Sequence, residues 1–152
     1  MQKNYCTYDI IENAKIYIMR GCTMNIVYNN ELSISDYCTL RKSAGWYDIS
    51  ENTVEKALEK SDYVVSAVID SVTVGMARLM TDGTQLLIMD VVVHPNYQRK
   101  GIGKGLMEHI VQHIENTYSQ MLVSLTTDEK NIGFYEKLGF NKIIGMRLLH
   151  GI

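Results

Sequence analysis

A glycine-rich stretch with basic side chains is the part of this sequence best suited to bind an anion. Residues 95–105 read Pro-Asn-Tyr-Gln-Arg-Lys-Gly-Ile-Gly-Lys-Gly. Pro95 lacks a backbone N–H, so it ends a preceding buried strand. Glycines let backbone amides approach a ligand without a Cβ atom in the way, and a helix start adds unpaired N–H donors and a positive dipole end. With Arg99, Lys100 and Lys104 at the rim, the stretch predicts a site for a phosphate or pyrophosphate group.

Two common glycine motifs do not account for this stretch. A dinucleotide-binding fingerprint requires G-x-G-x-x-G, but Leu106 stands three residues after Gly103. A P-loop requires G-x-x-x-x-G-K-[ST], yet Gln98 stands where the first glycine belongs and Gly105 replaces the Ser or Thr. The residues alone leave two interpretations open: an anion site, or glycines that only allow a helix to pack tightly on a strand.

One ionisable side chain interrupts the most apolar run of the sequence. Residues 86–93 read Leu-Leu-Ile-Met-Asp-Val-Val-Val. A carboxylate in a buried strand is costly unless it is paired or takes part in proton transfer. Asp90 is therefore a candidate for proton transfer, and a purely structural role for its carboxylate is the alternative.

The hydrophobic pattern supplies the strand and the helix that these residues require. Residues 84–94 form a largely apolar run that is typical of a central strand. In residues 101–118 apolar side chains recur every four positions, which is typical of a helix packed on a sheet. We expect further strands over 24–28, 63–69, 73–81, 121–126 and 141–149, two helices capped by Ser33 and Ser50, and a short helix over 131–138.

The order of these elements predicts one domain of mixed architecture. Asp70-Ser71 and Asp82-Gly83 are typical of two-residue hairpin turns between strands. Antiparallel hairpins followed by a crossover helix indicate a layered α/β (α+β) fold rather than a regular doubly wound sheet. We expect this single domain over residues 24–152. Residues 1–23 mix strand and helix signals, and we expect them to form an N-terminal appendage of uncertain structure.

The composition excludes several classes of protein. Fifteen Lys+Arg and 17 Asp+Glu residues give a formal net charge of −2, so no basic field points to nucleic acid or to an anionic membrane. No apolar run approaches the roughly 20 residues that a membrane span needs. The three cysteines lack CxxC spacing and a nearby His pair, which argues against a disulfide framework or a zinc site. We therefore expect a cytoplasmic protein that binds no metal, no nucleic acid and no membrane.

Two separate motifs resemble one superfamily of enzymes. Gln98-Arg99-Lys100-Gly101-Ile102-Gly103 resembles the Q/R-x-x-G-x-G/A signature of the GNAT superfamily of acyl-CoA-dependent N-acetyltransferases. Phe134-Tyr135-Glu136-Lys137-Leu138-Gly139-Phe140 resembles its second motif, at the usual separation. The resemblance covers residues 24–150 and implies a central mixed, mostly antiparallel sheet flanked by helices on both faces, with acetyl-CoA as the co-substrate.

A narrower resemblance points to one subgroup of this superfamily. Residues 75–83 and 90–107 are similar to small bacterial GNAT proteins and to the plant aralkylamine (serotonin) acetyltransferases. Residues 40–46 are similar to the end of the first helix of that subgroup, where a Gly-Trp pair leads toward the substrate.

The superfamily resemblance implies how the donor is held. Backbone groups of Val91, Val92 and Val93 would pair with the pantetheine arm as if it were an added strand. Asn131 would form a hydrogen bond with the same arm. The pyrophosphate would be held by Gln98, Arg99, Lys100, Gly101, Ile102, Gly103 and Lys104.

The resemblance also implies catalytic roles, because the reaction is a direct attack of an amine on the thioester. Tyr135 would give a proton to the leaving thiolate; the alternative is a packing tyrosine with a solvated hydroxyl. Asp90 would take the proton of the amine, directly or through water, or anchor the ammonium ion; the alternative is a carboxylate that caps backbone amides where the sheet splays. Asp128 is a second acid/base or substrate group, or the N-cap of the helix over 131–138.

The acceptor side is less defined by the residues. Trp46 and Tyr47 would line a pocket that accepts an aromatic group, or they belong to the core. We expect acetyl transfer to the primary amine of a small molecule, with arylalkylamines among the candidates. Acetylation of a protein N-terminus or lysine, and a non-catalytic acyl-CoA-binding regulatory module, are the alternatives. By analogy with the superfamily, a homodimer in which residues 141–152 supply an edge strand is a further expectation.

Overall fold

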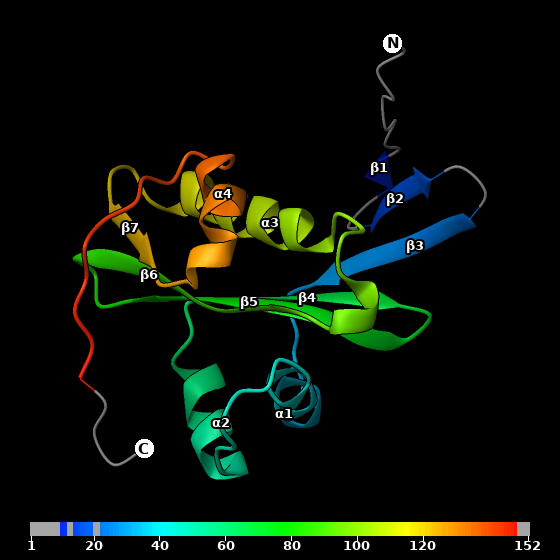
Figure 1. Cartoon of the computed structure of the whole chain (residues 1–152), viewed down its shortest axis with the longest axis horizontal. Coiled ribbons are helices and arrows are strands. Elements are labelled where there is room, and N and C mark those ends of the chain that lie inside the picture. Colours follow the sequence, from blue (N-terminus) through cyan, green and yellow to red (C-terminus); the bar gives the residue numbers. More distant parts are fainter. Residues whose placement is uncertain (1–9, 12–13, 20–21, 149–152) are drawn as a thin grey trace.

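The computed structural model describes the backbone of residues 10–11, 14–19 and 22–148, and the side chains from Met24 onward. The strands are β1 (Ile10–Ile11), β2 (Ala14–Met19), β3 (Cys22–Asn29), β4 (Tyr63–Ile69), β5 (Val72–Thr81), β6 (Gln85–Val93) and β7 (Leu122–Leu125). Within the described residues they form one seven-stranded sheet in sequence order (Figure 1). Neighbouring strands are antiparallel except β6 and β7, which are parallel. The expected mixed, mostly antiparallel sheet is therefore confirmed.

Helices cover both faces of the sheet, as expected (Figure 1). On one face lie α1 (Ile34–Ser43) and α2 (Glu51–Glu59), which share a core with β5 and β6 built around Tyr37, Leu40 and Met76. On the other face lie α3 (Ile102–Thr117) and α4 (Ile132–Glu136), and the larger core is on this side. Two short 3₁₀ helices, η1 (Pro95–Tyr97) and η2 (Glu129–Asn131), precede α3 and α4.

Local signals placed several element ends correctly. The Ser33 hydroxyl accepts a hydrogen bond from the Asp36 N–H at 3.0 Å, and the Ser50 hydroxyl accepts one from the Thr53 N–H at 3.2 Å, so both predicted N-caps are confirmed. Asp70 and Ser71 have φ of 48° and 65°, which is the backbone of the predicted two-residue turn between β4 and β5.

The turn after β5 differs from the prediction by one residue. Residues 82–84 connect β5 to β6, whereas Asp82-Gly83 alone was expected to do so. The Asp82 carboxylate accepts hydrogen bonds from the N–H of Thr84 at 2.9 Å and from its hydroxyl at 2.7 Å. This side-chain turn holds Thr84 in the loop, so β6 begins at Gln85.

Both ends of the described chain depart from the sequence-based expectation. The strand predicted over 141–149 is wrong: residues 141–148 are exposed and belong to no strand, and Leu149 lies outside the described residues. An apolar pattern forms a strand only beside a partner edge, and the described part of this segment has none. At the other end, β1, β2 and the start of β3 lie within residues 1–23 and continue the sheet; the rest of that segment is outside the described residues.

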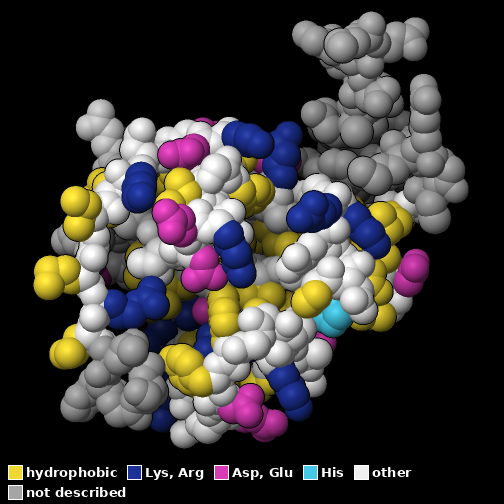
Figure 2. Space-filling view, in the orientation of Figure 1, with side chains coloured by type: hydrophobic (Ala, Val, Ile, Leu, Met, Phe, Trp, Pro, Cys, Tyr) yellow, Lys and Arg dark blue, Asp and Glu magenta, His cyan; other side chains and the backbone are white. Residues whose placement is uncertain are grey.

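The surface carries charges of both signs. Figure 2 shows basic and acidic side chains interspersed on the viewed face, in keeping with the formal net charge of −2. None of the helices in the described part of the chain has the length and apolar character needed to cross a membrane.

Candidate active site

The second half of β6 has an open edge. Its pairing with β7 runs from Gln85 opposite Leu122 to Ile88 opposite Leu125 and stops there. Residues 89–93 continue as strand and pair with β5 on the other side. Among the described residues no strand faces them on the β7 side, so this edge can accept an extended chain with its own amide groups. The structure thus places Val91, Val92 and Val93 on the free edge.

A β-bulge lies at the point where β6 leaves β7. Met76 of β5 faces Val92 while Arg78 faces Met89, so β6 has one residue more than β5 between these two pairs. Asp90 is in the bulge and has φ of 52°, in the left-handed region. A bulge bends its strand and redirects a side chain. Here it separates the paired half of β6 from the open half.

The carboxylate of Asp90 is held by three side-chain donors. On Oδ2 it accepts a hydrogen bond from the Tyr37 hydroxyl at 2.6 Å and one from Arg78 Nε at 2.5 Å. On Oδ1 it accepts one from Arg41 Nη1 at 3.3 Å. The side chain is only 9% exposed, so two guanidinium groups compensate a nearly buried charge. The structural alternative for Asp90 predicted backbone amides as donors, and the structure shows arginines and a tyrosine instead.

Tyr37 donates a hydrogen bond in this cluster, and its environment favours the protonated hydroxyl that this requires. Burial, the hydrogen bond to Asp90 and the negative charge of Asp90 raise the pKa of Tyr37 to about 12, against the opposing effect of the two arginines. The sequence-based search missed Tyr37, Arg41 and Arg78. A signal for Arg78 was present in the sequence: it is the only charged residue of β5, and Asp90 is the only charged residue of β6. Two opposite charges in neighbouring buried strands indicate an ion pair.

The loop after β6 forms the turn that the glycine-rich stretch predicted. Gln98 Nε2 donates to the Val93 carbonyl at 3.0 Å, which folds the loop back on the strand. Arg99 and Gly101 have φ of 61° and 79°, and Gly101 is the N-cap of α3 without a side-chain hydrogen bond to its first turn. The amides at the start of α3 therefore receive no cap from the residue before the helix, as an anion site requires.

Each basic side chain of the loop has a different environment. Lys100 donates to the Asn96 carbonyl at 3.2 Å and lies over the ring of Tyr97 at 5.1 Å. Lys104 forms an ion pair of 3.5 Å with Glu108. The ammonium group of Lys100 is thus directed toward η1, and the charge of Lys104 is paired with a carboxylate of α3.

The glycines at the start of α3 serve different purposes. A Cβ atom on Gly103 would lie 3.6 Å from the Phe134 ring and 3.7 Å from Val93, which are ordinary contact distances. A Cβ atom on Gly105 would lie 2.0 Å from the Tyr28 hydroxyl oxygen, so this glycine is required for packing. The packing interpretation therefore holds for Gly105, and the anion-site interpretation stays a prediction for the rest of the stretch.

Tyr135 is buried at the end of the larger core. It is 9% exposed, and the rings of Phe134 and Phe140 contact it edge-on at centroid distances of 4.9 and 6.0 Å. Burial raises the pKa of the Tyr135 phenol above its usual range, and a hydrogen bond with the Thr127 side chain opposes this in part. The phenol is protonated at neutral pH, as a proton donor must be. Its packing among aromatic rings fits the packing alternative equally, so both interpretations of Tyr135 stay open.

Asp128 and Asn131 are on the surface between β7 and α4. The Asp128 side chain is 77% exposed and pairs with Lys130 at 3.7 Å. Its position is the N-cap of η2, but its carboxylate accepts no capping hydrogen bond, so the side-chain capping role predicted for it is wrong. Asn131 is exposed and its side chain makes no capping hydrogen bond to α4.

Trp46 and Tyr47 lie on the surface loop after α1, not in the core. Their exposed fractions are 39% and 59%. The Arg41 guanidinium lies over the rings of Trp46 at 5.0 Å and Tyr47 at 5.2 Å, and Arg41 Nη2 donates to the Tyr47 carbonyl at 3.4 Å. Through Arg41, this loop is connected to Asp90 in the bulge.

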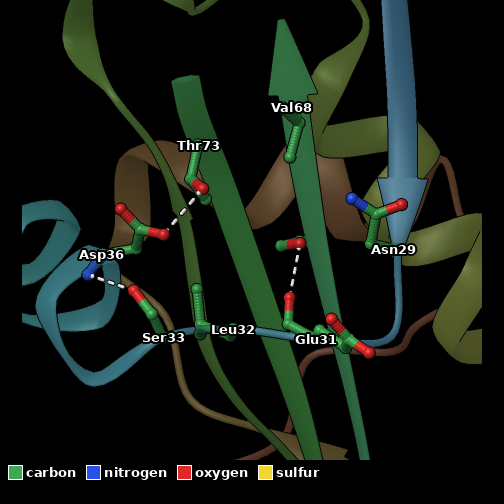
Figure 3. Close-up of a pocket in the computed structure, with 8 residues that line it drawn as sticks. Asn29, Glu31, Leu32, Ser33, Asp36, Val68 and Thr73 are labelled. Atoms are coloured by element: carbon green, nitrogen blue, oxygen red, sulfur yellow. Dashed lines mark hydrogen bonds between the residues drawn. The ribbon is translucent and has the colours of Figure 1, made fainter. Parts of the chain in front are cut away.

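None of these residues lines the polar cavity of about 410 Å³ at the start of α1 (Figure 3). Its hydroxyl groups are already engaged: Thr73 donates to Asp36 at 3.0 Å and Ser66 donates to the Glu31 carbonyl at 2.7 Å. The residues that line this cavity are Asn29, Glu31, Leu32, Ser33, Asp36, Ser66, Val68 and Thr73.

The described side chains include no cluster of three or more His, Cys, Asp or Glu groups suited to a metal ion.

Comparisons with known proteins bear on the fold and on the class of enzyme. Residues 60–142 match the family described as "Acetyltransferase (GNAT) domain". The uncharacterized N-acetyltransferase ycf52 of Porphyra purpurea is 33% identical over 141 residues, which cover 90% of this chain and 76% of that protein. The GCN5-related N-acetyltransferase 1, chloroplastic, of Arabidopsis thaliana is 31% identical over 57% of this chain and 45% of its own length. A solved structure from Staphylococcus aureus, described as a probable acetyltransferase, has a TM-score of 0.75 and 30% identity and covers 82% of this chain and 99% of its own.

Proposed function

The chain belongs to the GNAT family of acetyltransferases, and from this premise we propose that it transfers the acetyl group of acetyl-CoA to the primary amine of a small molecule. The observation that carries the proposal is the open edge of β6, which leads into the uncapped start of α3. A strand edge suits the amides of a pantetheine arm, and a helix start suits a pyrophosphate. In acetyl-CoA the pantetheine arm is joined to the pyrophosphate, so the two groups follow each other as the strand edge and the helix start do.

In this proposal the donor lies along β6. The backbone of residues 91–93 pairs with the pantetheine arm, and Asn131 forms a further hydrogen bond with it. The amides and basic side chains of residues 98–104 hold the pyrophosphate, in the turn that Arg99 and Gly101 form. When bound, acetyl-CoA supplies an activated acyl group and a thiolate leaving group.

Tyr135 supplies the proton that the leaving thiolate takes up, and solvent then returns to the phenolate a proton equivalent to the one that the amine releases. The bond from the amine nitrogen to the acyl carbon forms while the bond from that carbon to sulfur breaks. The phenol of Tyr135, which is protonated at neutral pH and whose pKa burial raises further, gives its proton to the thiolate. The support for this role is the position of Tyr135 in α4, beside the ring of Phe134 that reaches Gly103 of the donor loop.

The amine must lose a proton as well. Asp90 would have to give up an ion pair to accept it, because its two oxygens already accept three hydrogen bonds. We therefore assign the proton to water, with the exposed carboxylate of Asp128 as the second candidate. Asp128→Asn distinguishes the two: the rate constant falls about 100-fold or more if Asp128 is the base and stays unchanged if water is.

The acceptor side of the proposal consists of the loop after α1. Trp46 and Tyr47 present exposed aromatic rings beside the cluster of Asp90. Aromatic surfaces of this kind contact an aromatic ring of a ligand favourably. We therefore take an arylalkylamine as the first acceptor to test, in line with the subgroup that the sequence resembles.

The test is an acetylation assay on the full chain. The protein is incubated with acetyl-CoA and, in turn, 2-phenylethylamine, a polyamine, a lysine peptide and a peptide with a free N-terminus, and the released thiol is measured. We expect thiol release with 2-phenylethylamine. Release with the peptides alone would identify a protein acetyltransferase, and CoA binding without any release would identify a regulatory module; either result would refute the proposal.

Two expectations from the sequence remain proposals of their own. We expect the protein in the cytoplasm, although the Arabidopsis relative is named as chloroplastic; cell fractionation decides between the compartments. We expect a homodimer, and the mass in solution, measured by light scattering, distinguishes it from a monomer.

A further inference from the structure

Arg41 connects the two sides of the proposed active site. It is a buried side chain, 9% exposed, on the last turns of α1. Its Nη1 donates to Asp90 in the bulge of β6, and its Nη2 donates to the Tyr47 carbonyl in the loop after α1. One rigid, planar group thereby joins the strand that borders the donor site to the loop that borders the acceptor site.

Two aromatic rings of this loop also stack on the same guanidinium. The rings of Trp46 and Tyr47 have their centroids 5.0 and 5.2 Å from the Arg41 Cζ atom, and the ring of Tyr37 lies on α1 at 5.8 Å. Stacking of arginine on aromatic rings is favourable and has a defined geometry. The exposed rings of the loop therefore have a fixed support, although solvent covers much of their surface.

The bulge end of this connection is itself held in place. Arg78 Nε donates to Asp90, while Arg78 Nη1 donates to the Ala57 carbonyl and the Ser61 hydroxyl at the end of α2, each at 3.0 Å. Asp90 is thus tied to β5 and α2 through Arg78, and to α1 through Tyr37 and Arg41. A left-handed aspartate persists where its surroundings fix it in this way.

We infer that Arg41 is a positioning residue that sets the place of the acceptor amine. It holds the rings of Trp46 and Tyr47 at a fixed distance from the bulge, and Asp90 serves as the anchor for its guanidinium. The inference rests on the proposed function for the identity of the acceptor. The geometry of Arg41, Asp90 and the loop is independent of it.

The single tryptophan of the chain provides a readout of this geometry without turnover. In Arg41→Gln and Arg41→Lys, the loop loses the planar guanidinium that stacks on both rings and that donates to Asp90 and Tyr47 at the same time. We expect the emission of Trp46 to shift to longer wavelength and acrylamide to quench it more strongly, with CoA affinity and the far-UV circular dichroism unchanged. Lys42→Gln is the matched control, because it removes one positive charge from an exposed position of the same helix.

Steady-state kinetics with acetyl-CoA and 2-phenylethylamine test the functional part. We expect both Arg41 variants to raise KM for the amine by about 10-fold, the size of effect expected when contacts between an aromatic ring and a ligand are lost. We expect KM for acetyl-CoA and kcat to stay unchanged. This is the pattern that results when the lost interaction stabilises the bound substrate and the transition state equally. Lysine keeps the charge but lacks the planar fork, so Arg41→Lys is not expected to rescue the amine KM.

The results separate this inference from the proposed function. Trp46 fluorescence and quenching equal to the wild-type protein in both Arg41 variants would overturn it, and so would recovery of the amine KM by lysine. Absence of turnover in the wild-type chain counts against the proposed function alone, and the fluorescence comparison then decides on Arg41. If Arg41→Gln does not fold, Arg41→Lys carries the same comparison.

Discussion

Replacing Gly105 by alanine tests how α3 packs against the sheet. A Cβ atom at this position would lie 2.0 Å from the Tyr28 hydroxyl oxygen and 2.4 Å from the ring carbon that carries it. An ordinary contact begins at 3.4 Å, so the two elements must separate by 1.4 Å (3.4 minus 2.0) or the tyrosine must turn away. Tyr28 is 3% exposed and stacked on His109 at 4.5 Å, which leaves little room for either movement.

The magnitude follows from two opposing effects. Overpacking of a well-filled core costs about 3 kcal/mol at the upper end of the usual range, and alanine gains about 1 kcal/mol over glycine within a helix. We therefore expect Gly105→Ala to lower the free energy of unfolding by about 2 kcal/mol, or Tm by about 4–8 °C for a chain of this size.

The assay is urea denaturation followed by circular dichroism, with Gly133→Ala as the control. Gly133 is in α4, and a Cβ atom there would meet nothing within 4 Å, so the control is expected to be as stable as the wild-type protein or more so. In the Gly105→Ala background, Tyr28→Leu removes the clashing atoms and is expected to cost less than it does alone. Equal stability of Gly105→Ala and wild type would refute the packing described for the start of α3.

Further predictions concern the donor loop, the acid and the bulge. Gly103→Glu should abolish CoA binding measured by calorimetry, because it adds a negative charge and bulk beside the proposed pyrophosphate, whereas Gly103→Ala, whose Cβ would make ordinary contacts, should bind normally. Tyr135→Phe should lower kcat about 100-fold or more with unchanged CoA affinity; collapse of CoA binding would contradict the acid role. Because burial raises the pKa of Tyr135, the acid stays protonated as the pH rises, and kcat should not fall through loss of this proton until the pH exceeds the usual range of a phenol. Asp90→Asn should lower the free energy of unfolding by about 3 kcal/mol, since it leaves two buried guanidinium groups without their counter-charge, but kcat should fall less than the 100-fold or more expected for loss of a general base.

The elements that the sequence predicted well are those with local causes. Ser33 and Ser50 cap helices through hydrogen bonds to residues three positions later, and the Asp70-Ser71 turn depends on the backbone of two residues. The amphipathic pattern of α3 follows from its own side chains. The mixed sheet with helices on both faces was expected from the order of such elements and from the resemblance of two motifs.

What the sequence did not show depends on contacts between distant residues. The strand expected over 141–149 had the right pattern, but a strand needs a partner edge, and no local signal shows whether one is available. The bulge at Asp90 arises from a register shift against β5. The partners of Asp90 are separated from it by 12 to 53 residues in sequence, so the residues around Asp90 alone could not distinguish a base from an ion-paired anchor.

The exposure of Trp46 is a similar case. A lone tryptophan in a small domain is usually in the core, and the sequence therefore left its place open. In the structure its ring packs on the guanidinium of Arg41, five residues earlier on α1. That contact depends on how the chain leaves the helix at Gly45, which has φ of 74°.

The most direct test of the proposed function is a crystal structure of the full chain with CoA bound. The proposal predicts that the pantetheine arm pairs with the backbone of residues 91–93, that the pyrophosphate contacts the amides of residues 98–104, and that the sulfur lies within hydrogen-bond distance of the Tyr135 hydroxyl. CoA bound elsewhere, for example in the polar cavity at the start of α1, or with its sulfur remote from Tyr135, would contradict it.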